Sequence, residues 1–216
     1  MKRELRVTAD GSTTLHLPDW GESYHSKNGA IAEAYHVFIK NGFEITSGDV
    51  RILEIGFGTG LNALITLMES SKAHRQVSYV AVEGYPLAIE EAFQMNYGLS
   101  LGVDESIFKL LHTIPWERAE RISPHFSLEK RHLLFENISY NAEMHLIYFD
   151  AFGYRVQPEL WSESIFRKMY NALLPGGILV TYACRSVIRK NMQAAGFKVE
   201  KLVGPPGKRE MLRAVK

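Results

Sequence analysis

The stretch from Val50 to Asn62, VRILEIGFGTGLN, decides the fold of this chain. Its first half is apolar and rich in β-branched residues, which is typical of a buried parallel strand. Gly56, Gly58 and Gly60 follow at alternate positions, and from Leu61 onward the apolar residues have helical spacing. A strand, a glycine turn and a helix start present bare backbone and free N–H groups to a ligand, so the stretch predicts a nucleotide-type site.

The spacing of these glycines separates two classes of cofactor. A dinucleotide fingerprint needs G-x-G-x-x-G, but Leu61 stands at the sixth position. Glu54 adds a carboxylate at the end of the strand, which suits a cationic or amine-bearing ligand. The pattern E-x-G-x-G-x-G resembles the cofactor loop of class I S-adenosyl-L-methionine (SAM) methyltransferases. This resemblance implies cofactor contacts from Glu54, Gly56, Phe57, Gly58, Gly60 and Asn62.

Length and composition indicate one ordinary globular domain over residues 1–216. The net charge is only +1, so a surface that binds nucleic acid must be a local patch. The single Cys184 excludes an internal disulfide and suits a reducing cytoplasm. We find no secretory signal and no apolar run near the ~20 residues that cross a bilayer. We therefore expect a soluble cytoplasmic protein with no membrane or DNA partner.

The order of elements predicts an α/β fold with a mostly parallel, Rossmann-like sheet. Segments 197–203 and 210–215 flank a Pro/Gly turn with no helix between them, which predicts an antiparallel C-terminal hairpin at one sheet edge. We expect parallel strands over 50–55, 77–82, 132–135, 145–150 and 178–182. We expect helices after Pro86, over 159–174 and 185–195, and a helical excursion over 97–131 with an exposed helix at 117–122.

Residues 1–45 are expected to cover the site of a core over residues 46–216. Asp10-Gly11 lies between two short β-like segments and predicts a small β-ribbon outside the main sheet. A helix with apolar positions is expected after residue 30. The polar and aromatic segment 19–29 between them has two interpretations, a packed surface loop or a loop that folds over the cofactor.

Polar side chains at strand ends mark the rest of the expected site, because ligands bind at the carboxyl ends of parallel strands. Glu83 follows the second strand, where a carboxylate accepts hydrogen bonds from both ribose hydroxyls. Asn137 follows the third strand, where its amide could read the amino edge of adenine or simply form a turn. Asp150 follows the fourth strand, directly beneath the expected reaction site.

Over nearly its whole length the chain resembles the MnmC-type tRNA methyltransferase domain, which methylates 5-aminomethyl-2-thiouridine at the wobble position. The departures from the family lie at Glu136-Asn137, Ala151, Gly153-Tyr154 and Gln157, and they bear on the shape of the substrate pocket. The resemblance rests on Tyr24-His25-Ser26, Glu33, the glycine loop with Phe57, Glu83-Gly84-Tyr85-Pro86-Leu87, Phe149-Asp150-Ala151-Phe152, Pro158-Glu159-Leu160-Trp161 and Lys208-Arg209-Glu210-Met211.

This resemblance implies SAM-dependent N-methylation that gives 5-methylaminomethyl-2-thiouridine, with the anticodon wobble uridine of tRNA as the acceptor. Fused members carry a flavin oxidase domain that produces the amine. Because this chain ends after the methyltransferase, we expect a stand-alone form that needs no FAD. A separate enzyme would then supply the aminomethyl intermediate.

Amine methylation requires a neutral lone pair placed in line with the bond between carbon and sulfur. Asp150 is the best candidate to orient the amine and to stabilise the charge that grows on nitrogen. We expect positioning rather than full proton abstraction, since a carboxylate of ordinary pKa is a weak base. Tyr24 and Ser26 are expected to shape the substrate pocket and Phe152 to stack on the uracil. Lys208, Arg209, Arg185, Arg189 and Lys190 are candidates for RNA phosphate contacts, although a solvated face explains each cation equally well.

Several alternatives stay open. Methylation at uracil C5 needs a cysteine nucleophile, for which Cys184 is the only candidate. Aminopropyl transfer would need further acidic residues to hold a polyamine. Another amine, a small molecule, or a SAM- or RNA-binding module without catalysis would also suit the same features. The eight histidines are scattered without ligand spacing, so no metal site is expected.

Overall fold

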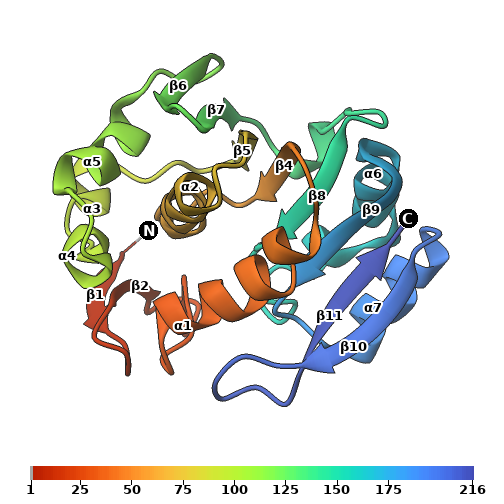
Figure 1. The fold of residues 1–216 in the computed structure, drawn as a ribbon. Coiled ribbons are helices and arrows are strands. Elements are labelled where there is room, and N and C mark those ends of the chain that lie inside the picture. The colour runs from red at the N-terminus through yellow and green to blue at the C-terminus, as the bar shows by residue number, and fades with distance from the viewer. Residues whose placement is uncertain (1) are drawn as a thin grey trace.

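The structure is a computed structural model that describes residues 2–216. One eight-stranded sheet forms its centre (Figure 1). Its strands are β4 (Val50–Ile55), β5 (Val77–Glu83), β6 (Ala119–Ser123), β7 (Phe126–His132), β8 (Met144–Phe149), β9 (Leu173–Thr181), β10 (Lys198–Val203) and β11 (Glu210–Val215). They are arranged in the order β10-β11-β9-β8-β4-β5-β7-β6.

The strands from β9 through β8, β4 and β5 to β7 are parallel neighbours. β11 is antiparallel to both β9 and β10, and β6 is antiparallel to β7. The α/β fold class is therefore confirmed, with a mostly parallel Rossmann-like sheet and an antiparallel C-terminal hairpin. The sheet order turns at β4, which has β5 on one side and β8 on the other. In open parallel sheets such a switch point is where ligands bind.

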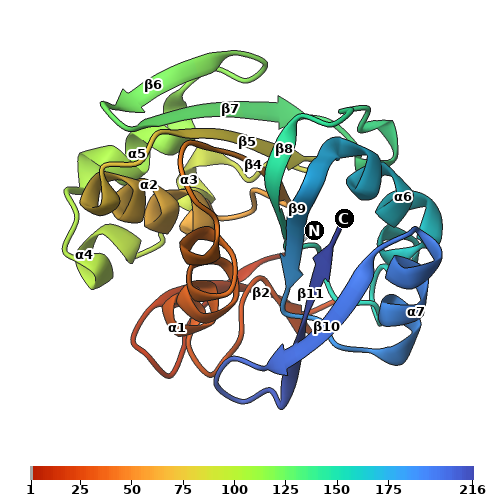
Figure 2. The same cartoon turned by 45° about the vertical axis from the view of Figure 1, so that its right-hand side comes forward.

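Helices cover both faces of the sheet (Figure 2). Since successive side chains of a strand point to opposite faces, Leu53 and Ile55 pack with one helical layer and Ile52 with the other. The face to which Ile52 points carries α1 (Ala30–Ala34), its π-helical continuation η1 (Tyr35–Lys40) and α2 (Leu61–Ala73), with α3 (Ile89–Ala92), α4 (Tyr97–Leu101) and α5 (Glu105–Thr113) beside them. The opposite face carries α6 (Glu163–Ala172) and α7 (Ser186–Ala194). No helix within residues 2–216 is long and apolar enough to cross a membrane.

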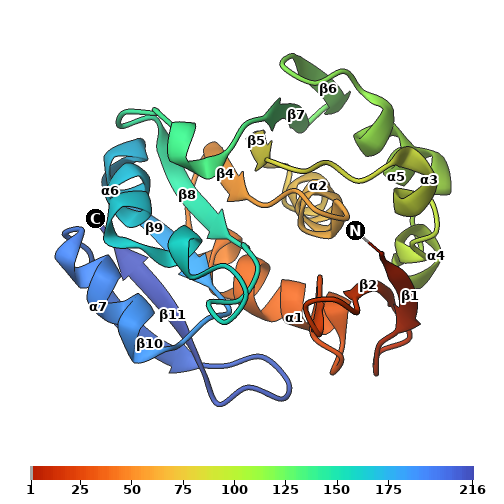
Figure 3. The same cartoon turned by 180° about the vertical axis from the view of Figure 1, so that it is seen from behind.

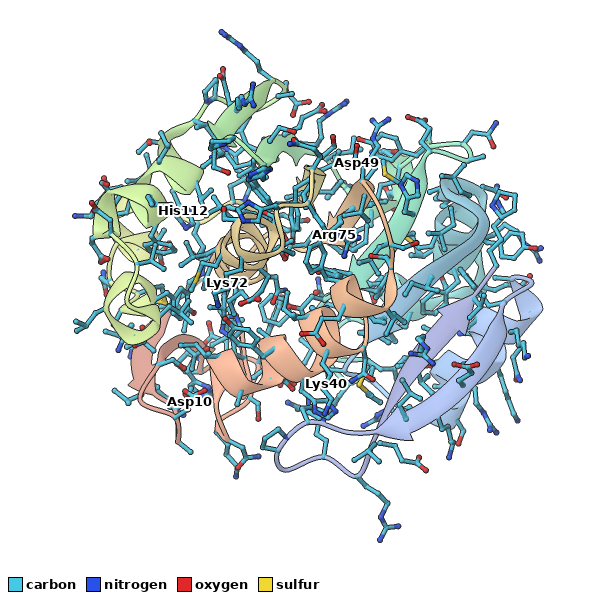
Figure 4. The ribbon with its side chains drawn as sticks, in the orientation of Figure 1. Asp10, Lys40, Asp49, Lys72, Arg75 and His112 are labelled. Atoms are coloured by element: carbon cyan, nitrogen blue, oxygen red, sulfur yellow. The ribbon has the colours of Figure 1, made fainter. Side chains whose placement is uncertain are left out.

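The N-terminal ribbon is confirmed and gains a third short strand. β1 (Glu4–Val7), β2 (Thr13–Leu17) and β3 (Glu22–Ser23) form a small antiparallel sheet beside α1 and α4 (Figure 3). Asp10 in the first turn of this ribbon accepts a hydrogen bond from the Ala32 N–H at 2.9 Å. Figure 4 labels Asp10 near the N-terminal end of α1. Because this contact caps a free N–H of the first helical turn, it fixes the ribbon to the core.

The region before the third parallel strand differs from expectation. Residues 117–122 were expected as an exposed helix, but most of them belong to β6, which turns back as β7. The third parallel strand is β7 over 126–132, and residues 135–137 form the 3-10 turn η3 (Phe135–Asn137). The inward-facing positions of β7 are Phe126, Leu128 and Lys130, all fully buried. Because Lys130 is charged, β7 lacks the alternation of apolar and polar residues that predicts a half-buried strand.

Two smaller corrections concern prolines. The helix expected after Pro86 begins only at Ile89, and the helix expected over 159–174 divides into the 3-10 turn η4 (Pro158–Trp161) and α6. Pro175-Gly176-Gly177 lies inside β9, where the pairing with β8 jumps from Leu173 to Ile178. Proline has no N–H to donate to the sheet, so the strand bulges there.

Candidate functional site

A cavity of about 820 Å³ opens at the carboxyl ends of β4, β5 and β8. This volume lies in the range of pockets that hold a cofactor or a drug-sized ligand. The glycine loop, the end of β5, η3, the loop after β8 and the N-terminal segment all contribute to its wall. Of the residues selected from the sequence, Tyr24, Gly56, Phe57, Gly58, Asn62, Glu83, Asp150 and Phe152 line it.

The glycine loop takes a backbone path that side chains rarely allow. Gly56, Gly58 and Gly60 have φ values of 94°, 50° and 76°, in the left-handed region. A Cβ at Gly56 would lie 2.9 Å from the carbonyl oxygen of Asp150, so this glycine lets the loop approach the end of β8. A Cβ at Gly60 would lie 2.9 Å from Nε2 of His112, away from the cavity. Gly60 therefore serves the turn into α2, and Gly58 faces the cavity.

Glu83 presents its carboxylate to the cavity in a fixed orientation. Its Oε2 accepts a hydrogen bond from the Gly58 N–H at 3.0 Å, and its Oε1 accepts one from the Tyr85 N–H at 2.9 Å. Each carboxylate oxygen keeps acceptor capacity for a further donor. The geometry suits a ligand with two adjacent hydroxyls, and contact with the cofactor ribose stays a prediction.

Asp150 directly follows β8, and among residues 2–216 only one of its carboxylate oxygens accepts a hydrogen bond. Its Oδ2 accepts a hydrogen bond from Nδ2 of Asn62 at 2.8 Å. Burial raises the pKa of Asp150 to about 7; the nearby carboxylate of Glu33 acts in the same direction, while the Asn62 hydrogen bond and the charge of Lys208 act against it. From the sequence, a carboxylate of ordinary pKa was expected at this position. Because the pKa lies near neutrality, Asp150 is a better base than expected.

Aromatic rings enclose the cavity near Asp150. The ring of Phe152 meets Tyr24 at 4.9 Å and Trp20 at 5.5 Å between centroids, edge to face in both cases. Nη2 of Arg155 donates to the carbonyl oxygens of Trp20 and Gly21 at 3.0 and 3.2 Å. The loop after β8 is thus tied to the N-terminal segment. This favours the second interpretation of segment 19–29, a loop that folds over the site.

Lys208 lies in the turn between β10 and β11, as expected, and its side chain is paired with other side chains of the protein. Its Nζ donates to Oε1 of Glu33 at 2.6 Å and lies 3.8 Å from the ring centroid of Tyr182. Tyr182 in turn donates its hydroxyl to the carbonyl oxygen of Ala151 at 2.8 Å. The backbone N–H of Ser26 donates to the other Glu33 oxygen at 2.9 Å. Lys208 and Ser26 therefore join the C-terminal hairpin to the N-terminal segment and do not line the cavity.

Glu54 and Asn137 also lie away from the cavity wall. Glu54 is fully buried beneath the glycine loop, on the face of the sheet that α2 covers. Asn137 is exposed, and its neighbour Glu136 lines the cavity instead. The difference follows from η3, because the 3-10 turn rotates successive side chains in different directions. A carboxylate therefore occupies the position where an amide was expected.

His25 and Thr59 are residues of the site that the sequence did not reveal as a pair. Nε2 of His25 lies 3.3 Å from Oγ1 of Thr59 in the glycine loop, and its Nδ1 lies 3.1 Å from the hydroxyl of Thr14. The hydroxyl of Tyr97 also donates to Thr59, at 3.1 Å. Burial lowers the pKa of His25 to about 4, so its ring is neutral at pH 7. These contacts hold the glycine loop against the N-terminal segment.

The remaining cations divide between the surface and the loop after β8. Arg209 is exposed in the turn between β10 and β11, and Lys190 is exposed on α7. Arg185 is also exposed, with its guanidinium 5.8 Å from the ring of Tyr154 in the loop after β8. Arg189 is half-buried on α7. Cys184 is half-buried, packs beside the helical layer of α6 and α7 and does not line the cavity. This position gives no support to Cys184 as the nucleophile for methylation at uracil C5.

The antiparallel β11 between β9 and β10, the glycine loop and the acidic strand ends together define the class of fold, the Rossmann-like sheet of SAM-dependent methyltransferases. Residues 117–216 match the family described as S-adenosyl-L-methionine-dependent methyltransferase. The cavity suits this cofactor, since bare backbone lines it at Gly56 and Gly58 and the Glu83 carboxylate is held at the cavity end of β5.

The chain is similar to the tRNA 5-methylaminomethyl-2-thiouridine biosynthesis bifunctional protein MnmC of two bacteria. It is 30% identical to the protein of Delftia acidovorans over 94% of this chain and 33% of that protein. It is 28% identical to that of Cupriavidus metallidurans over 92% of this chain and 32% of that protein. The chain thus spans about a third of the length of these curated relatives, and the resemblance seen in the sequence is confirmed for that part.

Two solved structures share the fold. MnmC2 from Aquifex aeolicus superposes with a TM-score of 0.78 and 25% identity, over 99% of this chain and 70% of that chain. Spermidine synthase from Thermotoga maritima superposes with a TM-score of 0.56 and 13% identity, over 100% of this chain and 71% of that chain. The second likeness shows the fold alone.

Proposed function

We propose that this chain N-methylates the 5-aminomethyl group of the wobble 2-thiouridine of tRNA and gives 5-methylaminomethyl-2-thiouridine. One observation carries the proposal: Asp150, with its pKa raised to about 7, faces a SAM-type cavity enclosed by Phe152, Tyr24 and Trp20. The similarity to MnmC proteins supports the choice of acceptor.

The proton balance of the reaction suits this carboxyl group. A free aminomethyl group is protonated at neutral pH, so it must lose a proton before its lone pair can act. Asp150 near its pKa of about 7 accepts that proton, and the neutral amine then attacks the methyl group. The methylated nitrogen carries a positive charge, which the Asp150 carboxylate stabilises once the accepted proton has passed to solvent. SAM supplies the electrophilic methyl group, and the electron pair of the broken carbon–sulfur bond stays on sulfur. Asp150 then acts as a base as well as a positioning group.

The aromatic rings near Asp150 have a corresponding role. Phe152 offers a face or an edge to the uracil once the wobble base enters the cavity, and Tyr24 limits the space beside Gly58. Within the cofactor half, Glu83 would hold the ribose, and Glu136 in place of Asn137 would face the adenine edge. Residues 1–45 would cover a catalytic core over 46–216.

For the tRNA itself, the exposed cations Arg209, Arg185 and Lys190 are the proposed phosphate contacts. Lys208 is left out of the proposed phosphate contacts because its ammonium group pairs with the carboxylate of Glu33. A separate enzyme would supply the aminomethyl group, and the protein would act in the cytoplasm, where tRNA is used.

Methyl transfer to tRNA tests the proposal directly. Purified protein and radiolabelled SAM are incubated with tRNA from a strain that lacks this protein, followed by mass spectrometry of the wobble nucleosides. We expect label in 5-methylaminomethyl-2-thiouridine and loss of the aminomethyl precursor. Label in another nucleoside, or transfer to a polyamine or small amine but not to tRNA, would overturn the proposed acceptor.

A further inference from the structure

Four buried polar atoms lie below the cavity without a hydrogen-bond partner among residues 2–216. They are both carboxyl oxygens of Glu54, Oδ1 of Asn62 and the hydroxyl of Tyr79. Glu54 and Tyr79 are 0% and 1% exposed, and Asn62 is 5% exposed. Buried polar groups in folded proteins are almost always paired, so four such atoms in one place call for an explanation.

The sheet register brings these atoms together. Glu54 on β4 pairs with Ala81 on β5 and with Tyr148 on β8. Paired residues of a sheet share a face, and Tyr79, two residues before Ala81, points to the same face. Asn62 lies in the first turn of α2, the helix that covers this face. The four atoms therefore meet between β4, β5 and the start of α2.

The charges around Glu54 disfavour its ionised form. Burial raises the pKa of Glu54 well above its ordinary value, and the carboxylates of Asp150 and Glu83 act in the same direction. The other titratable groups facing it, the hydroxyls of Tyr79 and Tyr148, are buried phenols whose pKa burial also raises. No Lys or Arg side chain among the described residues donates a hydrogen bond to Glu54. An ionised Glu54 would thus be an uncompensated buried charge.

We propose that Glu54 is a positioning residue that remains protonated and sets the orientation of the Asn62 amide, and through it the orientation of Asp150. The Glu54 O–H donates to Oδ1 of Asn62, and the Tyr79 hydroxyl donates to the other Glu54 oxygen. The proton on Glu54 is what pairs Oδ1 of Asn62, because that oxygen can only accept and a carboxylate cannot donate. The Tyr79 hydroxyl can donate to the remaining oxygen of either form of Glu54. The inference rests on the proposed function of Asp150.

This arrangement decides which end of the Asn62 amide faces Asp150. With Oδ1 engaged by Glu54, Asn62 turns its NH₂ group to Asp150 Oδ2, the 2.8 Å hydrogen bond that the structure shows. The opposite orientation would place two oxygens against each other. Asp150 Oδ1 is left free for the amine of the substrate. A residue buried below the cofactor loop thereby controls the geometry of the carboxyl group at the reaction site.

Substitutions at Glu54 separate this role from a merely structural one. E54Q keeps a donor for Asn62 at the same volume, whereas E54M is apolar and of similar size. We expect kcat for tRNA methylation to stay within about threefold of wild type in E54Q and to fall about tenfold or more in E54M. In E54M the rise of kcat with pH should move to higher pH, because Asp150 loses the hydrogen bond that lowers its pKa. The dissociation constant of SAM should change little, since Glu54 does not line the cavity.

Infrared difference spectroscopy gives a readout that does not depend on activity. At pH 8 the wild type should show the C=O band of a protonated carboxyl group, and E54Q should lack it, while Y79F should keep it with a shifted frequency. Absence of that band, or an E54Q variant as slow as a folded E54M, would overturn the inference. If no form methylates tRNA while the band is present, the proposed function fails and the protonation of Glu54 stands.

Discussion

The two halves of the cavity are built in different ways. The cofactor half comes from neighbouring segments of chain, in which β4 passes directly into the glycine loop and α2. The substrate half comes from the N-terminal segment and the loop after β8, and the ion pair that supports it from outside the cavity joins Glu33 to Lys208, 175 positions apart. Backbone geometry dominates the first half, and side-chain contacts dominate the second. Substitutions should therefore act on cofactor affinity in one half and on rate, pH dependence and tRNA affinity in the other.

The largest effect is expected at Asp150 in the substrate half. D150N keeps the shape but cannot accept a proton, so kcat should fall about 10²- to 10⁴-fold. The wild-type rate should rise with pH through about 7, where Asp150 ionises, and D150N should lack this rise. SAM affinity, measured by calorimetry, should change far less than kcat. A D150N variant with wild-type kcat would contradict the assignment.

The D150N substitution should also change how the stability of the protein depends on pH. The folded pKa of Asp150 is raised above its unfolded value of 3.8. The folded state therefore binds more protons between these pH values, and the contribution of this group to stability decreases as pH rises from about 4 to about 7. Thermal unfolding of D150N should show a smaller loss of stability over that interval than wild type.

A smaller and more specific effect is expected at Glu83 in the cofactor half. E83A removes both oxygens that hold the Gly58 and Tyr85 N–H groups and that would accept from the ribose. We expect the dissociation constant of SAM to rise about tenfold or more, in line with the loss of charge-assisted hydrogen bonds. The pH at which kcat rises should remain that of wild type. A shift of that pH in E83A would show that the halves are electrostatically coupled.

Substitutions of Glu33 and of Lys208 should shift the pKa of Asp150 in opposite directions. The charge of Lys208 lowers the pKa of Asp150 and that of Glu33 raises it. K208M should therefore move the rise of kcat to higher pH, and E33Q should move it to lower pH. K208M also leaves the buried Glu33 unpaired and should cost about 1–3 kcal/mol in the free energy of unfolding. Equal shifts of the same sign would refute this electrostatic role.

The smallest effect is expected at Arg209, which is exposed at the hairpin turn. R209A should weaken tRNA binding several-fold and lower the slope of log affinity against log salt by about 1. R118A is a matched control, because Arg118 is also exposed but precedes β6 at the other edge of the sheet. If R209A and R118A bind tRNA equally well at every salt concentration, the C-terminal turn is not part of the RNA surface.

Most of the sheet was predictable because its strands follow simple patterns. β4, β5, β8 and β11 are apolar and short, and their neighbours break them with glycine, proline or charged residues. Two strands were not predicted correctly, β6 and β7, and the second of them buries Lys130. The Nζ of Lys130 donates to the carbonyl oxygen of His112 at 2.6 Å, and Trp116 lies 4.9 Å away. Such compensation for a buried charge comes from other elements and is invisible in the local pattern.

The sequence by itself determined the fold class, the glycine loop and the acidic strand ends, because each depends on residues close together in the chain. Only the tertiary structure decided the protonation tendency of Asp150, the withdrawal of Glu54 from the cavity and the partner of Lys208. These three properties depend on burial and on charges that are distant in sequence. Both arise only when the helices and strands pack together. The type of a residue determines which chemistry its side chain can perform. The surroundings of that side chain determine its ionisation state and its hydrogen-bond or ion-pair partner.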